Sequence, residues 1–301
     1  AAGYKVVLTG EGADEVFGGY DLFKEAKVRR FIACQPSSPR RQRIIERLYP
    51  YLAASPSQGR AFSQHFFAAG ADRPDDPAYA HVTRMATTRR TLPFFTPEWQ
   101  QRLGAHDLRA TLGATLPAAF AGWHAMGRDQ YVEARTLMSG YLLSSQGDRM
   151  AMAASIEARF PFLDHRVIEF AGRLPPHLKM RGLREKLLLK KAFAHELPPQ
   201  ITARSKQPYR VPDSASFFDA GRARPWVAEL LSPAQLNDAG LFDAPAVGKL
   251  VAKCAAGRAI GFCDNMAFIG VLSTMLLHDQ FIRPSGPLSA PSPGPSSGPA
   301  A

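Results

Sequence analysis

Two acidic residues lie in a glycine-rich turn near the start of the chain, where they could hold a metal ion. The turn, Gly10-Glu11-Gly12-Ala13-Asp14, follows the apolar residues 4–8, which have the composition of a β-strand. A helix beginning just after a strand presents free N–H groups and a positive dipole end, which favour an anion such as phosphate. Because Glu11 and Asp14 would repel bare phosphate, we expect Mg²⁺ between a carboxylate and pyrophosphate oxygens. Alternatively, Asp14 and Glu15 only complement the dipole of a helix that ends at Gly18-Gly19.

Two later segments also combine charged side chains with turn-forming residues. The first, residues 146–164, contains Ser-Ile-Glu-Ala-Arg-Phe-Pro-Phe-Leu-Asp. Its charged side chains include those of Asp148, Arg149, Glu157, Arg159 and Asp164. The second, residues 204–212, places Lys206 close to Pro208 and Pro212 in an irregular loop. A lysine in such a loop ordinarily faces solvent, so its type and position alone do not assign it a function.

Taken in order, the three segments resemble signatures of the synthetase domain of the glutamine-hydrolysing asparagine synthetases. The resemblance covers residues 4–282, is weak between residues 35 and 125, and does not extend past Pro284. It implies an α/β fold of the adenine-nucleotide α-hydrolase type, of which this chain holds one late parallel strand and a large helical remainder. The fragment is therefore expected to be predominantly helical with few strands. Its binding crevice should lie at the carboxyl end of the strand at residues 4–8.

The resemblance also implies an activity, the ATP-dependent conversion of aspartate to asparagine. In that reaction the side-chain carboxylate of aspartate attacks the α-phosphate of ATP, pyrophosphate leaves, and glutamine-derived ammonia attacks the resulting β-aspartyl-adenylate. Adenylation concentrates negative charge at phosphorus, so its site needs a cationic group and Mg²⁺. On this resemblance, Lys206 stabilises that charge and Asp14 binds Mg²⁺. Glu11 then accepts the proton that ammonia loses.

Further residues complete the expected site. The nucleotide and its metal are expected to contact the acidic turn at Gly10, Gly12, Ala13 and Asp14. Candidates for contact with the substrate are Asp148, Arg149, Glu157 and Arg159. The alternative for Glu157 and Arg159 is a buried ion-pair network around Phe160-Pro161-Phe162 that sets the turn without touching the substrate.

Two features of the family that the chain resembles are absent from this sequence. Position 1 is Ala where those synthetases have a glutaminase cysteine, and no Ser-Gly-Gly-Xaa-Asp-Ser pyrophosphate loop precedes the acidic turn. We therefore expect residues 1–283 to be the C-terminal part of a synthetase domain whose partner is an N-terminal glutaminase region. A homodimer is a further possible assembly. Without the loop, the chain alone is expected to make no adenylate.

Composition indicates a compact body followed by a polar tail. The 301 residues are 46% hydrophobic, which suffices for a sizeable core. Residues 284–301 consist almost entirely of Pro, Ser, Gly and Ala, so a disordered tail is expected there. The formal net charge is +11, but the basic residues are scattered without interleaved aromatic side chains. Nucleic-acid binding is therefore not expected.

No segment has the pattern of a signal peptide or a membrane span. The longest apolar stretch, near residues 268–277, includes Ser273 and Thr274, as in a buried helix. The three cysteines, at 34, 254 and 263, show no metal-binding spacing and are expected to be reduced core thiols. We expect a cytoplasmic protein that acts on small molecules and contacts neither membrane nor nucleic acid.

Helical patterns dominate after the opening strand. Residues 129–145 carry apolar side chains at three- and four-residue spacings, which predicts one face packed in the core. Residues 164–174 are expected to form a helix capped by Asp164, and residues 185–196 a helix ended by prolines. Further helices are expected at residues 247–253 and 259–281, and residues 35–125 as helices joined by loops.

Two other functions fit the same segments. The first is an adenylating amide synthetase of secondary metabolism, such as a β-lactam synthetase or lasso-peptide cyclase, which uses a different carboxylate. The second is a non-catalytic fragment or interaction module. An intact glutaminase cysteine upstream would favour asparagine synthesis.

Overall fold

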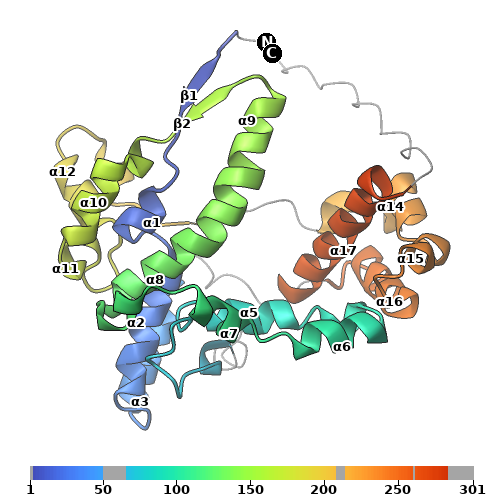
Figure 1. The fold of residues 1–301 in the computed structure, drawn as a ribbon, viewed down its shortest axis with the longest axis horizontal. Helices are drawn as coiled ribbons and strands as arrows, with labels where there is room; N and C mark the ends of the chain where they lie inside the picture. The colour runs from blue at the N-terminus through green and yellow to red at the C-terminus, as the bar shows by residue number, and fades with distance from the viewer. Residues whose placement is uncertain (1–2, 50–65, 208–213, 260–261, 284–301) are drawn as a thin grey trace. The chain divides into compact units, whose positions relative to one another are not determined.

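The computed structural model describes residues 3–49, 66–207, 214–259 and 262–283. The chain divides into two compact units, each treated by itself: residues 1–85 with 108–208, and residues 86–107 with 209–301. The first unit begins with β1 (Val6–Leu8), α1 (Ala13–Phe17), α2 (Asp21–Ala33), α3 (Pro39–Gln42) and η1 (Arg43–Arg47). In order, its later elements are α7 (Leu108–Ala114), η4 (Ala118–Gly122), α8 (Ala125–Glu133), η5 (Ala134–Asp148), α9 (Arg149–Ala153), β2 (Glu157–Arg159), η6 (Pro161–Leu163), α10 (His165–Arg173), α11 (Pro176–Lys179), α12 (Leu187–Ala192) and α13 (Pro199–Thr202). Helix α5 (Val82–Arg89) runs from the first unit into the second (Figure 1).

The second unit is a helical body with one short hairpin. Its elements are η3 (Leu92–Phe94), α6 (Pro97–Ala105), η7 (Ser214–Phe217), β3 (Phe218–Asp219), β4 (Arg222–Ala223), α14 (Pro225–Leu230), α15 (Pro233–Ala239), α16 (Ala244–Ala255) and α17 (Phe262–Phe281). Phe268, Val247 and Leu236 are fully buried at the centre of its core. Helix α16 contains the predicted helix at 247–253, and α17 confirms most of the predicted helix at 259–281.

The strand that leads to the acidic turn pairs in parallel with β2. Val6 lies opposite Glu157 and Leu8 opposite Arg159, and the backbone N–H of Thr9 donates to the carbonyl oxygen of Arg159 at 2.9 Å. The described residues form four short strands among many helices, which confirms the prediction of a mostly helical fragment with few strands. The strand β2, however, was not predicted, because Glu157 and Arg159 were expected in a turn.

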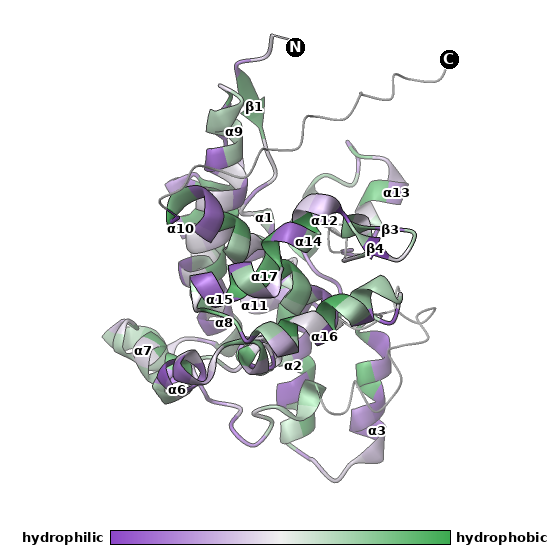
Figure 2. Cartoon of the chain, turned by 90° about the vertical axis from the view of Figure 1, so that its right-hand side faces the viewer, coloured by the Kyte–Doolittle hydropathy of each residue, from purple (hydrophilic) through white to green (hydrophobic). Residues whose placement is uncertain are grey.

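Strand β1 is hydrophobic and yet open to solvent. Figure 2 colours β1 among the hydrophobic segments, and its three residues are all exposed. Parallel strands are ordinarily covered on both faces. Within the described residues, β1 therefore has apolar surface that nothing covers.

The first unit is built around α2, whose side chains are buried on nearly every side. Leu22, Phe23 and Ala26 pack with Tyr79 and other residues in one apolar cluster. Figure 1 shows α1 and α2 following β1, which places the acidic turn between the β1–β2 pair and this packed helix. Helix α1 ends at Gly18, which adopts the left-handed conformation and confirms the predicted stop.

The predicted apolar face at residues 129–145 is not a core face. Helix α8, the π-helix η5 and α9 form one continuous rod (Figure 1), and Val132 on α8 is fully buried. Leu137 and Tyr141 on η5 are 48% and 52% exposed. A π-helix bonds residue i to i+5 and so has more residues per turn. Side chains whose spacing would align them on one face of an α-helix therefore do not share one face of this π-helix.

Of two other predicted helices, one matches its prediction and one differs in extent. Asp164 caps α10 by accepting a hydrogen bond from the backbone N–H of Arg166, as predicted. Helix α12 begins at Leu187 rather than residue 185, because Lys186 is in the left-handed region with φ of 49°. It ends at Ala192, before the prolines that were expected to end it.

No helix among the described residues is both long enough and apolar enough to span a membrane. All three cysteines are free thiols; Cys254 is buried, but Cys34 is exposed, so the prediction of core thiols is wrong for Cys34. The tail predicted at residues 284–301 lies outside the described residues.

Candidate functional site

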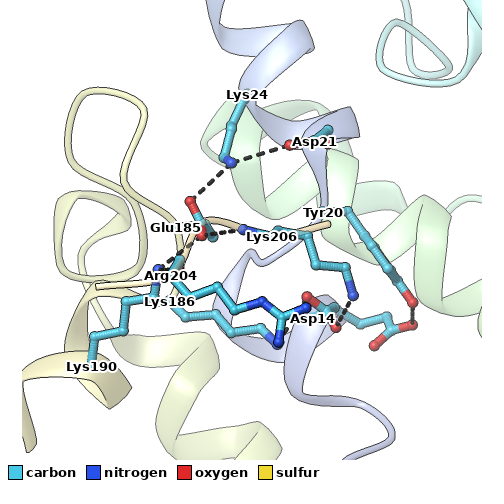
Figure 3. A network of polar contacts seen from close by, with 10 residues as sticks. Asp14, Tyr20, Asp21, Lys24, Glu185, Lys186, Lys190, Arg204 and Lys206 are labelled. Atoms are coloured by element: carbon cyan, nitrogen blue, oxygen red, sulfur yellow. Dashed lines mark hydrogen bonds and ion pairs between the residues drawn. The ribbon is translucent and has the colours of Figure 1, made fainter. Parts of the chain in front are cut away.

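The carboxylate of Asp14 lies between the ammonium groups of two lysines. Lys206 Nζ is 3.0 Å from Asp14 Oδ2, and Lys186 Nζ is 2.9 Å from Asp14 Oδ1. Figure 3 shows the side chains converging from three segments: α1, the residue before α12, and the loop after α13. The site thus brings together Asp14 and Lys206, as the sequence predicted, and adds Lys186.

Two glycines create the space in which Asp14 sits. A Cβ atom on Gly19 would lie 1.9 Å from Asp14 Oδ1 and 2.3 Å from Lys186 Cε. A Cβ atom on Gly12 would lie 2.1 Å from Leu163 Cδ2, and the φ of Gly12 is 86°. A side chain at either position would therefore displace the acidic turn or its neighbours.

Tyr20 forms one wall of the Asp14 site. Its ring centroid is 5.3 Å from Lys206 Nζ, within the range of a cation–π contact. Its hydroxyl donates a hydrogen bond to Glu15 Oε1 at 2.9 Å, which fixes the ring. Burial raises the pKa of Tyr20 and also that of Glu15.

A second carboxylate, that of Glu185, lies behind the two lysines and is buried. It accepts a hydrogen bond from Lys190 Nζ and lies 2.9 Å from Lys24 Nζ. Burial alone would raise the pKa of Glu185, but the hydrogen bonds from Lys190 and Lys24 lower it to about 2. Lys24 also pairs with Asp21 at 3.1 Å (Figure 3). The lysine site therefore lies against a network of ionised side chains that pair with one another.

A cavity of about 410 Å³ adjoins the lysines. Lys186, Arg204 and Lys206 contribute to its lining, together with apolar side chains from η6, α12, α13 and the segment between the two helices. These apolar residues are Phe162, Leu189, Phe193, Leu197 and Ile201. Its size and its mixture of an apolar wall with a few charged groups are typical of small-molecule sites.

Glu11 lies in the same turn as Asp14 but is not part of the ion-pair cluster. Its side chain is half-buried and makes no hydrogen bond or ion pair within the described residues. Its backbone N–H donates to Thr9 Oγ1 at 3.3 Å. The carboxylate of Glu11 is therefore available as an acceptor, whereas that of Asp14 is engaged by cations.

The other predicted residues lie outside the lysine cluster. Glu157 and Arg159 form an ion pair at 2.7 Å on β2, with side chains about 60% exposed, so the alternative of a buried network is wrong. Alternate strand residues share a face, which explains the pairing. Asp148 and Arg149 are exposed where η5 meets α9 and have no hydrogen-bonded or ionic side-chain partner among the described residues. Gly10 is exposed, whereas Ala13 is buried in α1.

The fit of Mg²⁺ to Asp14 can be judged from its buried oxygen. Asp14 Oδ1 receives no hydrogen bond, since its contact with Lys186 is a charge contact only. A buried carboxylate oxygen with unused lone pairs suits a hard cation. No group of three metal-ligating side chains occurs among the described residues. Asp14 therefore fits as one ligand of an ion whose other ligands come from phosphate or water.

Lys186 and Glu185 were missed by the sequence reasoning, which placed both inside a regular helix. A usable signal was the run Arg184-Glu185-Lys186 directly before three leucines, since a charged pair at a helix start often faces a partner of opposite sign.

Comparison with known proteins gives a consistent result. The sequence profile of the asparagine synthase family matches residues 1–278. Amidase chry2 of Gibberella zeae is 29% identical over 81% of this chain and 37% of its own length. A putative glutamine-hydrolysing asparagine synthetase of Mycobacterium tuberculosis is 29% identical over 82% of this chain and 35% of its own. Asparagine synthetase 1 of Bacillus subtilis is 27% identical over 77% and 34%. The chain thus spans about a third of the length of these relatives.

Proposed function

Since the chain belongs to the asparagine synthase family, we propose that it supplies part of a site that activates a carboxylate with ATP and converts it to an amide. The single observation that carries the proposal is the placement of Lys206 and Lys186 on the two oxygens of Asp14. Two mobile ammonium groups around one metal-binding carboxylate suit a polyphosphate, whose charge they balance. This cluster lies in the turn after β1, where anions bind in open parallel sheets.

In the first step, an oxygen of the substrate carboxylate attacks the α-phosphorus of ATP, and the bond from that phosphorus to the leaving pyrophosphate breaks. Lys206 and Lys186 stabilise the negative charge that builds up on the phosphoryl oxygens. In this proposal Gly10, which is exposed, contacts the nucleotide directly, and buried Gly12 and Ala13 shape the turn behind it. Mg²⁺, held by Asp14, supplies additional neutralisation of pyrophosphate charge when bound.

In the second step, ammonia attacks the acyl carbon of the adenylate, and the bond to AMP breaks. The nitrogen must lose a proton, and Glu11 is the proposed acceptor because its carboxylate has no partner within the described residues. Glu157 and Arg159 lie on β2 beside the start of this turn and are proposed contacts for the amino and carboxylate groups of the substrate. Asp148 and Arg149 are weaker candidates for the same role.

We propose aspartate as the acceptor acid and glutamine as the source of ammonia, by likeness to relatives named asparagine synthetases. The ammonia would come from a glutaminase region, in the cytoplasm, with a homodimer as one possible assembly. A second candidate acceptor is a carboxylic acid with an apolar body. It is favoured by the apolar wall of the 410 Å³ cavity beside Lys186 and by the amidases among the relatives.

Exchange of labelled pyrophosphate into ATP distinguishes the two acceptors. The chain is combined with the pyrophosphate-loop region and incubated with ATP, Mg²⁺ and one acid at a time. Aspartate-dependent exchange supports asparagine synthesis, whereas exchange that requires an aryl or branched-chain acid supports the second candidate. If none of the tested acids supports exchange, the adenylating function is contradicted and a non-catalytic module is favoured.

A further inference from the structure

Glu185 has no step in the proposed chemistry, yet it contacts helix α12 and the loop that carries Lys206 and is adjacent to Lys186. Its Oε1 accepts hydrogen bonds from Lys190 Nζ at 2.8 Å and from the backbone N–H of Lys206 at 2.9 Å. Lys190 Nζ also donates to the carbonyl oxygen of Arg204 at 2.8 Å. The loop is thus held on both sides of Ser205, by the carboxylate on one side and the ammonium on the other (Figure 3).

Glu185 constrains Lys186 in a different way, through the backbone that joins the two residues. The two residues are adjacent, and Lys186 adopts the left-handed conformation with φ of 49°. For a residue with a Cβ this conformation costs roughly 1–2 kcal/mol and persists where surrounding contacts hold it. Here Glu185 is fixed on one side by Lys24 and Lys190, and Lys186 reaches Asp14 on the other.

The burial of Glu185 makes its charge an inefficient means of holding the fold together. The residue is 3% exposed, and the cost of desolvating a buried ion pair usually cancels its attraction. An apolar group of similar volume would fill the same space, but it could not accept a hydrogen bond from the N–H of Lys206. The position therefore requires a charged acceptor, which holds the ammonium groups of Lys24 and Lys190 as well as the backbone N–H of Lys206.

We propose that Glu185 is a positioning residue, which sets Lys206 and Lys186 on the two oxygens of Asp14 without touching substrate. The proposal rests on the function proposed above for these lysines. It predicts that loss of the Glu185 carboxylate releases both ammonium groups while the rest of the first unit stays folded.

Competitive labelling of lysines with trace acetic anhydride tests this on the 301-residue chain without turnover. Mass spectrometry compares the reaction of Lys186 and Lys206 with that of exposed Lys191, and buried Lys179 reports general loosening. Glu185→Gln should make Lys186 and Lys206 react about fivefold faster or more, which corresponds to about 1 kcal/mol of lost restraint. Lys179 should be unchanged. Unchanged labelling of the two site lysines, or an equal rise at Lys179, would overturn the proposal.

Two further variants make the labelling result specific. Glu133 is also a 3% exposed carboxylate of the first unit, paired with His81 at 2.6 Å, so Glu133→Gln is the matched control and should leave Lys186 and Lys206 unaffected. Glu185→Asp keeps the charge but shortens the side chain, so its carboxylate should no longer reach the backbone N–H of Lys206. The labelling of Lys206 should therefore still rise. A labelling pattern of Glu185→Asp identical to wild type would contradict the role of the backbone contact.

A double-mutant cycle then connects Glu185 with chemistry, using chain supplied with the pyrophosphate-loop region. Glu185→Gln should lower the adenylation rate about tenfold, with little change in the KM for ATP, but less than about threefold in a Lys206→Ala background. Equal losses in both backgrounds would mean that Glu185 acts on folding alone. If wild type makes no adenylate, the proposed function fails, while the labelling result still decides the role of Glu185.

Discussion

Lys206 and Asp14 are 192 positions apart in the sequence, yet Lys206 Nζ donates a hydrogen bond to Asp14 Oδ2 at 3.0 Å. No local sequence pattern predicts that the two segments carrying these residues contact each other. Their contact joins the anion-binding turn after β1 to a cationic loop, and Lys186 completes the arrangement from a third segment.

Asp14 and Glu11 should affect different half-reactions. Asp14→Asn should slow Mg²⁺-dependent pyrophosphate release, because an amide oxygen is an uncharged and poorer ligand for a hard cation. Glu11→Gln should spare pyrophosphate release and slow amide formation, because it removes a proton acceptor. Separate assays of pyrophosphate and of the amide product measure the two steps. Equal losses in both assays for both variants would refute this division of roles.

Glu185 should make stability depend on pH in a defined window. Its pKa in the folded chain is about 2, against an ordinary value of 4.5, so the folded state favours the ionised form. The stabilisation is complete above pH 4.5 and is lost as pH falls towards 2, with an upper size of about 3 kcal/mol. Urea unfolding of wild type and Glu185→Gln should show a stability difference that shrinks across this window. A difference that is constant or that grows on acidification would contradict the assignment.

Gly19→Ala should disturb the site more than a glycine replacement nearby. The new Cβ would overlap Asp14 Oδ1 and Lys186 Cε, so the unfolding free energy should fall by about 1–3 kcal/mol. Gly10→Ala is the control, since nothing lies within 4 Å of the added atom, and it should change stability by less than about 0.5 kcal/mol. Equal effects of the two replacements would show that the Asp14 pocket is not tightly packed.

The chain alone should show no aspartate-dependent pyrophosphate exchange. The sequence contains no Ser-Gly-Gly-Xaa-Asp-Ser pyrophosphate loop, and we propose that such a loop, supplied separately, holds the other side of the polyphosphate. Addition of the loop-bearing region, in cis or in trans, should restore exchange. Exchange by the 301-residue chain on its own would refute the dependence on that region.

The sequence predicted those parts of the site that depend on local pattern. A strand, a glycine turn and a helix stop at Gly18 follow from residue types, and the cap at Asp164 follows from its position before an apolar run. The left-handed Lys186 does not, because its conformation depends on residues distant in the sequence, such as its partner Asp14 and the Lys24 that pairs with adjacent Glu185. The pairing of β2 with β1 is likewise long-range, and its residues Glu157 and Ala158 have low strand propensity.

Periodicity also misled where the helix type changed. The spacing of Leu137 and Tyr141 fits an α-helix, but tertiary structure imposes a π-helix there and leaves both side chains exposed. No local rule predicts that change, since π-helices are rare. The charged residues of the first unit show the same limit, because Glu185 gains its role only from the elements that pack around it.

The most direct test of the central claim is the rate of pyrophosphate release by Lys206→Ala, with the pyrophosphate-loop region supplied and ATP and aspartate saturating. Loss of one preorganised cation should lower the rate by about 10²–10³-fold, or roughly 3–4 kcal/mol, with little change in ATP affinity. Lys191→Ala, at an exposed position on α12, should retain the wild-type rate, and thermal unfolding should show that both variants fold. A Lys206→Ala rate within about threefold of wild type would contradict the claim that this lysine acts on the phosphate.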